Sequence, residues 1–198
     1  MELQQTSFDE IIDVKQLTVS MKWTTAADFD LAAAYETKEG KRGLVYFGGL
    51  GNLDAFPYIR LSKDDGVGDT GGDNEESLHI NRLYGMNHVW LFCWDYGRVQ
   101  EGKSARFKDS DVNLTITDEL GNNVTVEIDT GERGNVYYMA SIDNTNPTGA
   151  TLINTSLAGT LKGLKTLEQL MALVRYTNEK WKMKNEKFSY KRLIWQTI

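Results

Sequence analysis

The sequence predicts an all-β fold, a two-sheet antiparallel β-sandwich with a C-terminal amphipathic α-helix. Before residue 161, apolar and polar residues alternate with a period of two, as they do in strands with one buried face. Turns rich in Gly, Asp and Asn separate these short runs, which is typical of sandwiches and barrels. After residue 165 the apolar period becomes helical. Helices do not alternate with the strands, so a doubly wound α/β fold is disfavoured.

The expected strands of the first half follow this alternation. In the first two, every second residue is apolar, so one face of each strand is buried. The expected strands are 14–23, with Leu17, Val19, Met21 and Trp23 on one face; 29–35, with Phe29, Leu31, Ala33 and Tyr35 on one face; and the short runs 44–47 and 58–61.

The second half contains a different kind of strand at 89–94. Its sequence, VWLFCW, is apolar on both faces, which indicates a central strand covered on two sides. The segment DELGNN reads as a hairpin connection between two alternating runs. The expected strands after 89–94 are 112–116 and 124–128, which flank this hairpin, then 136–142 and 151–155.

A helix is expected from residue 166. Thr166 and Gln169 have the spacing of a capping box. We expect the helix to pack on the sandwich, because any surface helix must bury its apolar face, although a partner could also cover it. The domains are therefore expected to be 1–161, a sandwich, and 162–198, a basic helical extension packed on it. The apolar face consists of Leu167, Leu170, Met171, Val174 and Trp181.

Charge is unevenly distributed along the 198 residues. The formal net charge is −6. Residues 162–198 hold 9 basic and 3 acidic side chains, whereas residues 1–161 hold 13 and 25. An acidic body repels phosphate backbones, so nucleic-acid binding is not expected. The N-terminus lacks a secretory signal, no apolar run reaches the roughly 20 residues of a membrane span, and Cys93 is a single cysteine. We therefore expect a soluble protein of the reducing cytoplasm.

Negative side chains are concentrated in three places that could bind a hard divalent cation. Residues 64–76 read DDGVGDTGGDNEE, with six carboxylates and four glycines. Asp28 and Asp30 project from the same face if 28–31 is extended. Asp95 directly follows the central strand. Calcium takes 6–8 oxygen ligands in flexible geometry, and it would offset this repulsion. The alternatives are a solvated acidic loop, a turn capped by Asp28 beside a solvated Asp30, and a turn capped by Asp95.

An enzyme is not expected. The only imidazoles are His79, on the polar face of an expected strand, and His88, beside the central strand. No nucleophile elbow, phosphate-binding loop or metalloprotease helix occurs. Cys93 lies inside an apolar run and is expected to be an inert core thiol. The pair Asp109 and Asp111 has no glycine-rich loop beside it and is interpreted as a turn or a solvated pair.

These acidic segments occur in an order that resembles the TerD-like domain of tellurite-resistance and general-stress proteins. The resemblance covers roughly residues 14–160, and the segment at 41–65 is most similar to TerA-type members. The motifs that carry it are WTTAADFDL at 23–31, GDTGGDNEES at 68–77, LHINRL at 78–83, VWLFCWDYGR at 89–98 and ARFKDSDVNLTITDELGN at 105–122.

The resemblance implies a non-catalytic, calcium-binding β-sandwich that acts in stress or tellurite resistance. It also implies assembly with other Ter-type proteins or self-association, contact at the inner face of the membrane, and no small-molecule substrate. The acidic loop is shorter than in the family, and Glu75 and Glu76 stand where aspartate is usual. Both differences affect how many calcium ions the loop can bind. The metal ligands implied are Asp28, Asp30, Asp69, Asp73, Glu75, Glu76 and Asp95.

Two other functions remain open at this stage. A metal-free structural or assembly module of the same fold would use the helix and the basic C-terminal end as its functional surface. A module that binds lipid headgroups or sugars through calcium would use the acidic loop.

Overall fold

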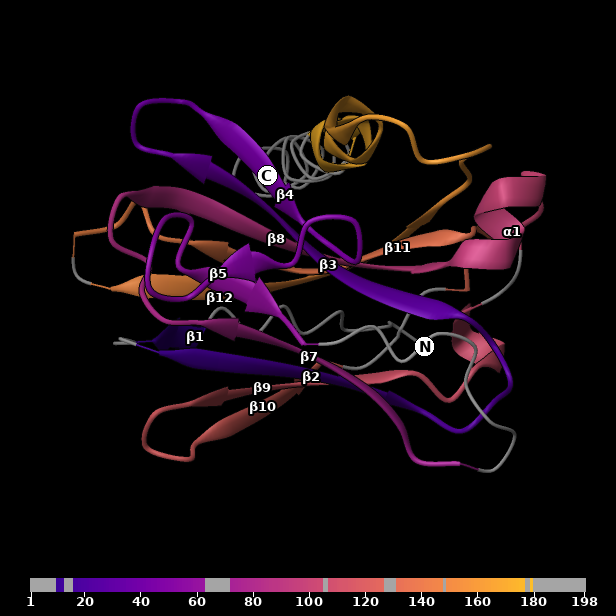
Figure 1. Ribbon diagram of the computed structural model, residues 1–198, viewed down its shortest axis with the longest axis horizontal. Coiled ribbons are helices and arrows are strands. Elements are labelled where there is room, and N and C mark those ends of the chain that lie inside the picture. Colours follow the sequence, from indigo (N-terminus) through magenta and orange to yellow (C-terminus); the bar gives the residue numbers. More distant parts are fainter. Residues whose placement is uncertain are drawn as a thin grey trace, which may run out of the picture. The chain divides into compact units, whose positions relative to one another are not determined.

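The computed structural model describes residues 10–12, 16–62, 72–104, 107–126, 131–147, 149–176 and 179. Two six-stranded antiparallel sheets form a β-sandwich, with the strand order given below (Figure 1). Sheet A contains β1 (Glu10–Ile12), β12 (Ala150–Gly159), β11 (Val136–Asp143), β8 (Met86–Asp95), β3 (Phe29–Thr37) and β4 (Arg42–Val45). Sheet B contains β10 (Asn123–Val126), β9 (Asn113–Asp118), β2 (Leu17–Trp23), β7 (Asn74–Ile80), β6 (Ile59–Leu61) and β5 (Gly51–Asn52).

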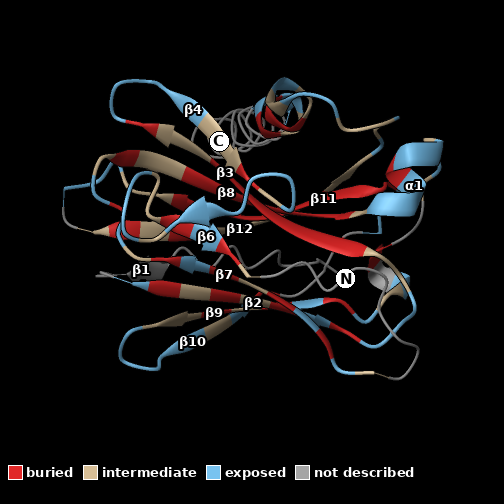
Figure 2. Cartoon of the chain, viewed as in Figure 1, coloured by how far each residue is buried: buried red, intermediate tan, exposed pale blue. Residues whose placement is uncertain are grey.

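The predicted fold class is confirmed, and so is the alternation that predicted it. Along β2, Leu17, Val19, Met21 and Trp23 are each no more than 3% exposed. The inner face of β3 presents Phe29, Leu31 and Ala33 to the same core. Figure 2 shows the resulting buried stripes along the strands.

Strand β8 is the central strand that the apolar run at 89–94 predicted. It pairs with β11 on one side and with β3 on the other. Every residue from Val89 to Trp94 is buried. Because both faces of β8 are covered, its sequence is continuously apolar and shows no alternation.

Several features differ from the expectation, including the short strands β1 and β5, which were not expected. β12 runs ten residues, against the 151–155 that were expected. β7 begins at Asn74, inside the segment interpreted as an acidic loop. A short helix, α1 (Tyr96–Glu101), follows β8. A 3-10 turn, η1 (Phe107–Asp109), precedes β9. Both short helices lack the repeated apolar positions from which a helix is predicted, since α1 buries one side chain, Val99.

The chain divides into two compact units, Met1–Leu164 and Lys165–Ile198. In the second unit, residues 167–176 are helical. The Oε1 atom of Gln169 accepts hydrogen bonds from the backbone N–H groups of Lys165 (2.8 Å) and Thr166 (3.1 Å), as a capping box does. Trp181 lies outside the described residues. The packing of this helix on the sandwich stays a prediction.

Within the described residues, no helix combines the length and the apolar character needed to span a membrane.

Candidate metal centre

Four strand ends meet at one end of the sandwich. In sheet B, the last residue of β2, Trp23, pairs with the first residue of β7, Asn74. In sheet A, the first residue of β3, Phe29, pairs with the last residue of β8, Asp95. The rings of Trp23 and Phe29 meet edge to face, with centroids 5.9 Å apart, and join the two pairs across the core. The predicted acidic residues of the described part therefore lie around this end.

Glu76 lies on the inner face of β7 and is 1% exposed. Its Oε2 atom accepts a hydrogen bond of 2.6 Å from the backbone N–H of Leu31 on β3. β4 pairs with β3 only from Ala33 to Glu36, so it does not extend alongside Leu31. A buried N–H group needs an acceptor, and the Glu76 carboxylate supplies one from the opposite sheet.

The negative charges of Asp30, Glu76 and Asp95 all act on the thiol of Cys93. Asp30 is 3% exposed, and Cys93 is fully buried. Burial raises the pKa of the Cys93 thiol well above its ordinary value, and the negative charges of Glu76, Asp30 and Asp95 raise that pKa further. The expectation of an inert core thiol agrees with this environment. Three of the predicted ligands, from β3, β7 and β8, therefore bear charges that affect the same thiol.

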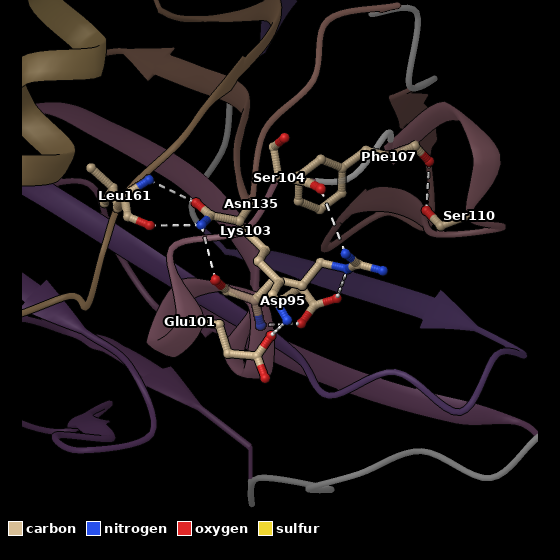
Figure 3. A network of polar contacts seen from close by, with 9 residues as sticks. Asp95, Glu101, Lys103, Ser104, Phe107, Ser110, Asn135 and Leu161 are labelled. Carbon is tan, nitrogen blue, oxygen red and sulfur yellow. Dashed lines mark hydrogen bonds and ion pairs between the residues drawn. The ribbon is translucent and has the colours of Figure 1, made fainter.

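Asp95 also caps helix α1. Its Oδ1 atom accepts a hydrogen bond from the backbone N–H of Arg98 at 2.9 Å. Its Oδ2 atom lies 3.4 Å from Nε of Arg98, and the Asp95 side chain is 17% exposed (Figure 3). The sequence left two roles open for Asp95, a cap or an ion ligand, and the structure shows it as a cap.

Glu75 and Asp73 lie away from this group. Consecutive residues of a strand face opposite sides, and Glu75 is exposed on the outer face of β7. Its Oε1 atom accepts a hydrogen bond from Oγ of Ser20 (2.5 Å), and its Oε2 atom lies 3.4 Å from Nζ of Lys22. Glu75 and Asp73 border an open hollow of about 340 Å³. Its lining residues are Lys22, Trp23, Thr24, Asp73, Asn74, Glu75, Asp111 and Asn113.

Of the two remaining predicted ligands, the structure describes Asp28 and does not describe Asp69. Asp28 is half-buried, and its carbonyl oxygen accepts a 2.8 Å hydrogen bond from the N–H of Tyr96, which continues the β3–β8 pairing by one step. Asp69 lies outside the described residues. Among the described residues, no group of three or more His, Cys, Asp or Glu side chains forms a ready-made metal site.

Two polar residues that hold this end together were not predicted. Asp111, interpreted as a turn or a solvated residue, accepts hydrogen bonds from both N–H and Oγ1 of Thr24. The Asp-x-Asp spacing of Asp109 and Asp111 was the sequence feature that could have pointed to this residue. Asn135 is fully buried, and its side chain bonds Arg98 O (3.2 Å), Leu161 O (2.7 Å) and Leu161 N (2.8 Å). No sequence pattern distinguishes this asparagine from one in a turn.

Carboxylates at this end of the sandwich have the donor chemistry of a hard divalent cation, but Asp30 and Glu76 do not face each other. Phe29 and Leu31 point into the core, so Asp30 between them starts from the opposite face of sheet A. Asp30, Glu76 and Asp95 offer carboxylate oxygens, the ligands that calcium prefers. Two of these carboxylates are almost completely buried, where negative charge is costly unless hydrogen bonds or a cation offset it. The protein itself supplies a positive charge here, because Nε of Arg98 lies 3.4 Å from Oδ2 of Asp95.

Comparison with known proteins gives no match to a family model and no match to a curated protein. Solved structures do match, and two of them are described here. One is a homologue of the telluride resistance protein TerD, SCO6318 from Streptomyces coelicolor A3(2), with 18% identity over 81% of this chain and 96% of that one and a TM-score of 0.55. The other is a protein of unknown function, SAV2460, with 14% identity over 74% and 93% and a TM-score of 0.56.

The chain has a TerD-like fold. The likeness spans nearly the whole length of both solved chains. Sequence identities of 14% and 18% support a shared fold and nothing more. The function is therefore argued from the residues of this chain. The similarity to TerA-type members stays a prediction.

Proposed function

We propose that this chain is a non-catalytic, calcium-binding β-sandwich module of the TerD type, which works in the cytoplasm through assembly with other Ter-type proteins or with copies of itself. The observation that carries the proposal is the placement of Asp30, Glu76 and Asp95 near the ends of three strands at one end of the sandwich, with Asp30 and Glu76 almost completely buried. Their negative charges come from three separate strands, and a bound cation would offset their mutual repulsion.

In this proposal the ligands are Asp28, Asp30, Asp69, Glu76 and Asp95, as the resemblance to TerD-like domains implies. Asp73 and Glu75 belong to the outer hollow, where Lys22 already partners Glu75. Calcium fits better than magnesium, because magnesium demands near-ideal octahedral geometry whereas calcium accepts an irregular cage of oxygens.

The described side chains support a non-catalytic role. His79 is exposed and lies 3.2 Å from Oγ1 of Thr18. His88 stacks on Trp90, with centroids 5.4 Å apart. The thiol of Cys93 is buried with a raised pKa, so little thiolate is available for attack.

A metal-free module of the same fold is the second candidate, and a specific observation favours it. Glu76 and Asp95 already have structural roles, as the acceptor for Leu31 N–H and as the cap of α1. In that case the two carboxylates stabilise the sandwich without an ion, and only assembly remains as the function.

Thermal melting with calcium and with a chelator separates the two candidates. A site held at a hundredfold excess of calcium over Kd raises the free energy of unfolding by about 2.7 kcal/mol. We expect the wild type and the outer control Glu75→Gln to melt at higher temperature with calcium, and Asp30→Asn to lose that shift. An identical melting temperature with calcium and with chelator in all three proteins would leave the metal-free module.

A further inference from the structure

Sheet B packs one face on the core and turns the other away from sheet A (Figure 1). Along β2, β7 and β9, the residues between the buried positions point to this outer face. In its middle these residues are short and uncharged, and the pairing register places them side by side across the strands. Such side chains lose little rotamer freedom when another surface covers them. They are Thr18, Ser20, Ser77, Thr115, Thr117 and Thr125.

One end of this outer face is basic. Arg60 lies between the buried residues of β6 and points outward, beside His79 on β7, and both side chains are exposed. Arg82, just after the end of β7, adds a second guanidinium at the same end. It lies over the ring of Tyr58, 4.3 Å from the ring centroid, which is a cation–π contact. Two positive charges therefore lie at the β6–β7 corner of the face.

The opposite end of the face is acidic. Asp73, Glu75 and Asp111 border the open hollow of about 340 Å³ there, together with Lys22. Nζ of Lys22 lies 3.4 Å from the Glu75 carboxylate and offsets that charge, so a surplus of negative charge remains. Along β7, the basic and acidic ends are separated by four to six residues, which is about 13–20 Å.

Arg60 and Asp73 keep their charges available for an outside partner. Both are exposed, and neither forms an ion pair within the part of the chain that the structure describes. Asp54 and Glu119 lie in the loops that precede β6 and follow β9, and neither of them pairs with Arg60.

Opposite charges at its two ends make this face complementary to itself. Two copies can lie face to face about a two-fold axis in the plane of the contact. An axis along the strands places each end on the same end of the other copy, where like charges repel. An axis across the strands reverses the strand direction, so each basic end lies on an acidic end, and this happens twice. Charge complementarity therefore selects the second arrangement.

We propose that two copies of this chain associate through the outer face of sheet B, about a two-fold axis that runs across the strands. Arg60 and His79 of one copy lie against Asp73 and Glu75 of the other, and the serine and threonine rows meet in the middle. The inference rests on the self-association named in the proposed function and is independent of ion binding.

The size of the face sets the strength of this dimer. Four strands and about eight residues along each give a contact of roughly 500 Å² per copy. That area is at the low end for specific protein interfaces. The dimer is therefore weak, and it weakens further as salt screens the charges at its two ends.

Sedimentation equilibrium of the full chain at low salt, up to about 500 µM, measures the dimer. Arg60→Glu and Asp73→Arg each bring like charges together at both symmetric contacts, and each should raise the dimer Kd at least about tenfold. Arg133→Glu is the matched control, because it makes the same change at an exposed residue that precedes β11 of the other sheet. Its dimer Kd should stay within about twofold of the wild-type value.

A mixture of Arg60→Glu with Asp73→Arg tests the two-fold arrangement itself. In the mixed dimer one symmetric contact is unchanged and both charges of the other are reversed, so each contact again joins opposite charges. We expect the mixture to form a heterodimer with a Kd within about threefold of the wild-type dimer, although each variant alone stays monomeric. Circular dichroism of each variant verifies that it is folded.

The outcomes separate this inference from the proposed function. A wild-type dimer that neither Arg60→Glu nor Asp73→Arg weakens overturns this surface and leaves self-association standing. Folded single variants that do not recover the dimer when mixed overturn the two-fold arrangement. A wild type that is monomeric at about 500 µM overturns both the inference and the self-association, whereas calcium binding is judged separately by the melting experiment.

Discussion

Glu75 and Glu76 are neighbours in the sequence, yet their carboxylates lie on opposite faces of β7. The Glu75 carboxylate is 3.4 Å from Nζ of Lys22 on the outer face, and Oε2 of Glu76 is 2.6 Å from the backbone nitrogen of Leu31 on the inner face. One side chain is exposed, and the other is buried. The two residues therefore have different energetic roles, and substitutions at each should differ accordingly.

Alanine at position 76 should destabilise the fold far more than alanine at position 75. Glu76→Ala leaves the buried N–H of Leu31 without its charged acceptor, and losing such a bond costs about 2–3 kcal/mol of unfolding free energy. Glu75→Ala removes an exposed ion pair worth at most about 1 kcal/mol. Urea unfolding in the presence of a chelator measures both. Equal losses in the two variants would contradict the different burial of the two side chains.

Asn135→Ala should be among the more destabilising substitutions in the sandwich. It removes three side-chain hydrogen bonds, to Arg98 and Leu161, from a fully buried site. Leaving buried polar groups unsatisfied costs about 1–3 kcal/mol for each group. We expect a loss of about 3 kcal/mol or more by urea unfolding. Asn123→Ala, at an exposed position of β10, is the control and should change stability little.

The turn between β9 and β10 contains Asp118, whose pKa should depend on its hydrogen bonds. Hydrogen bonds from Asn122, first from its side chain and then from its backbone, lower the pKa of Asp118. A carboxyl with a lowered pKa stabilises the fold above its unfolded pKa, and this contribution disappears as the pH falls through the folded value. Asn122→Ala should therefore raise the pKa of Asp118 toward its ordinary value. NMR titration of the carboxyl measures it; an unchanged pKa in the variant would count against this explanation.

Cys93 should resist thiol reagents while the sandwich is folded. Burial and the nearby charges of Glu76, Asp30 and Asp95 raise the pKa of its thiol, so the reactive thiolate is rare and inaccessible. At pH 8 we expect labelling only as fast as the protein unfolds, and full labelling in urea. A protein with an added exposed thiol, Asn123→Cys, controls for reagent activity. Rapid labelling of the folded wild type would show that Cys93 is accessible.

The regular part of the fold could be predicted from the sequence, because burial imposes a period. The four inward residues of β2 alternate with polar ones, and both faces of β8 are covered, so each leaves a recognisable pattern. α1 leaves none, since six residues with one buried side chain contain no repeat. The start of β7 was not predicted for a different reason, because its first residues are acidic. Glu75 is paired with Lys22, and Glu76 accepts a hydrogen bond from the Leu31 N–H, and both partners come from other strands.

The candidate site could be predicted in composition but not in arrangement. The sequence identified which carboxylates are crowded along the chain. It could not assign Glu75 and Glu76 to separate faces, because that assignment depends on where β7 starts. It also could not find Asn135, whose partners at Arg98 and Leu161 are 37 and 26 positions away. Contacts at such separations depend on the strand order, which no local pattern encodes.

Isothermal titration with calcium and with magnesium tests the central claim most directly. The wild type and Glu75→Gln should release or absorb heat on binding calcium, with weaker binding of magnesium. The double variant Asp30→Asn, Glu76→Gln should lose the calcium heat, because both buried carboxylates are neutralised while their size is kept. Calcium binding of wild-type affinity in the double variant, or no binding in the wild type, would contradict the account.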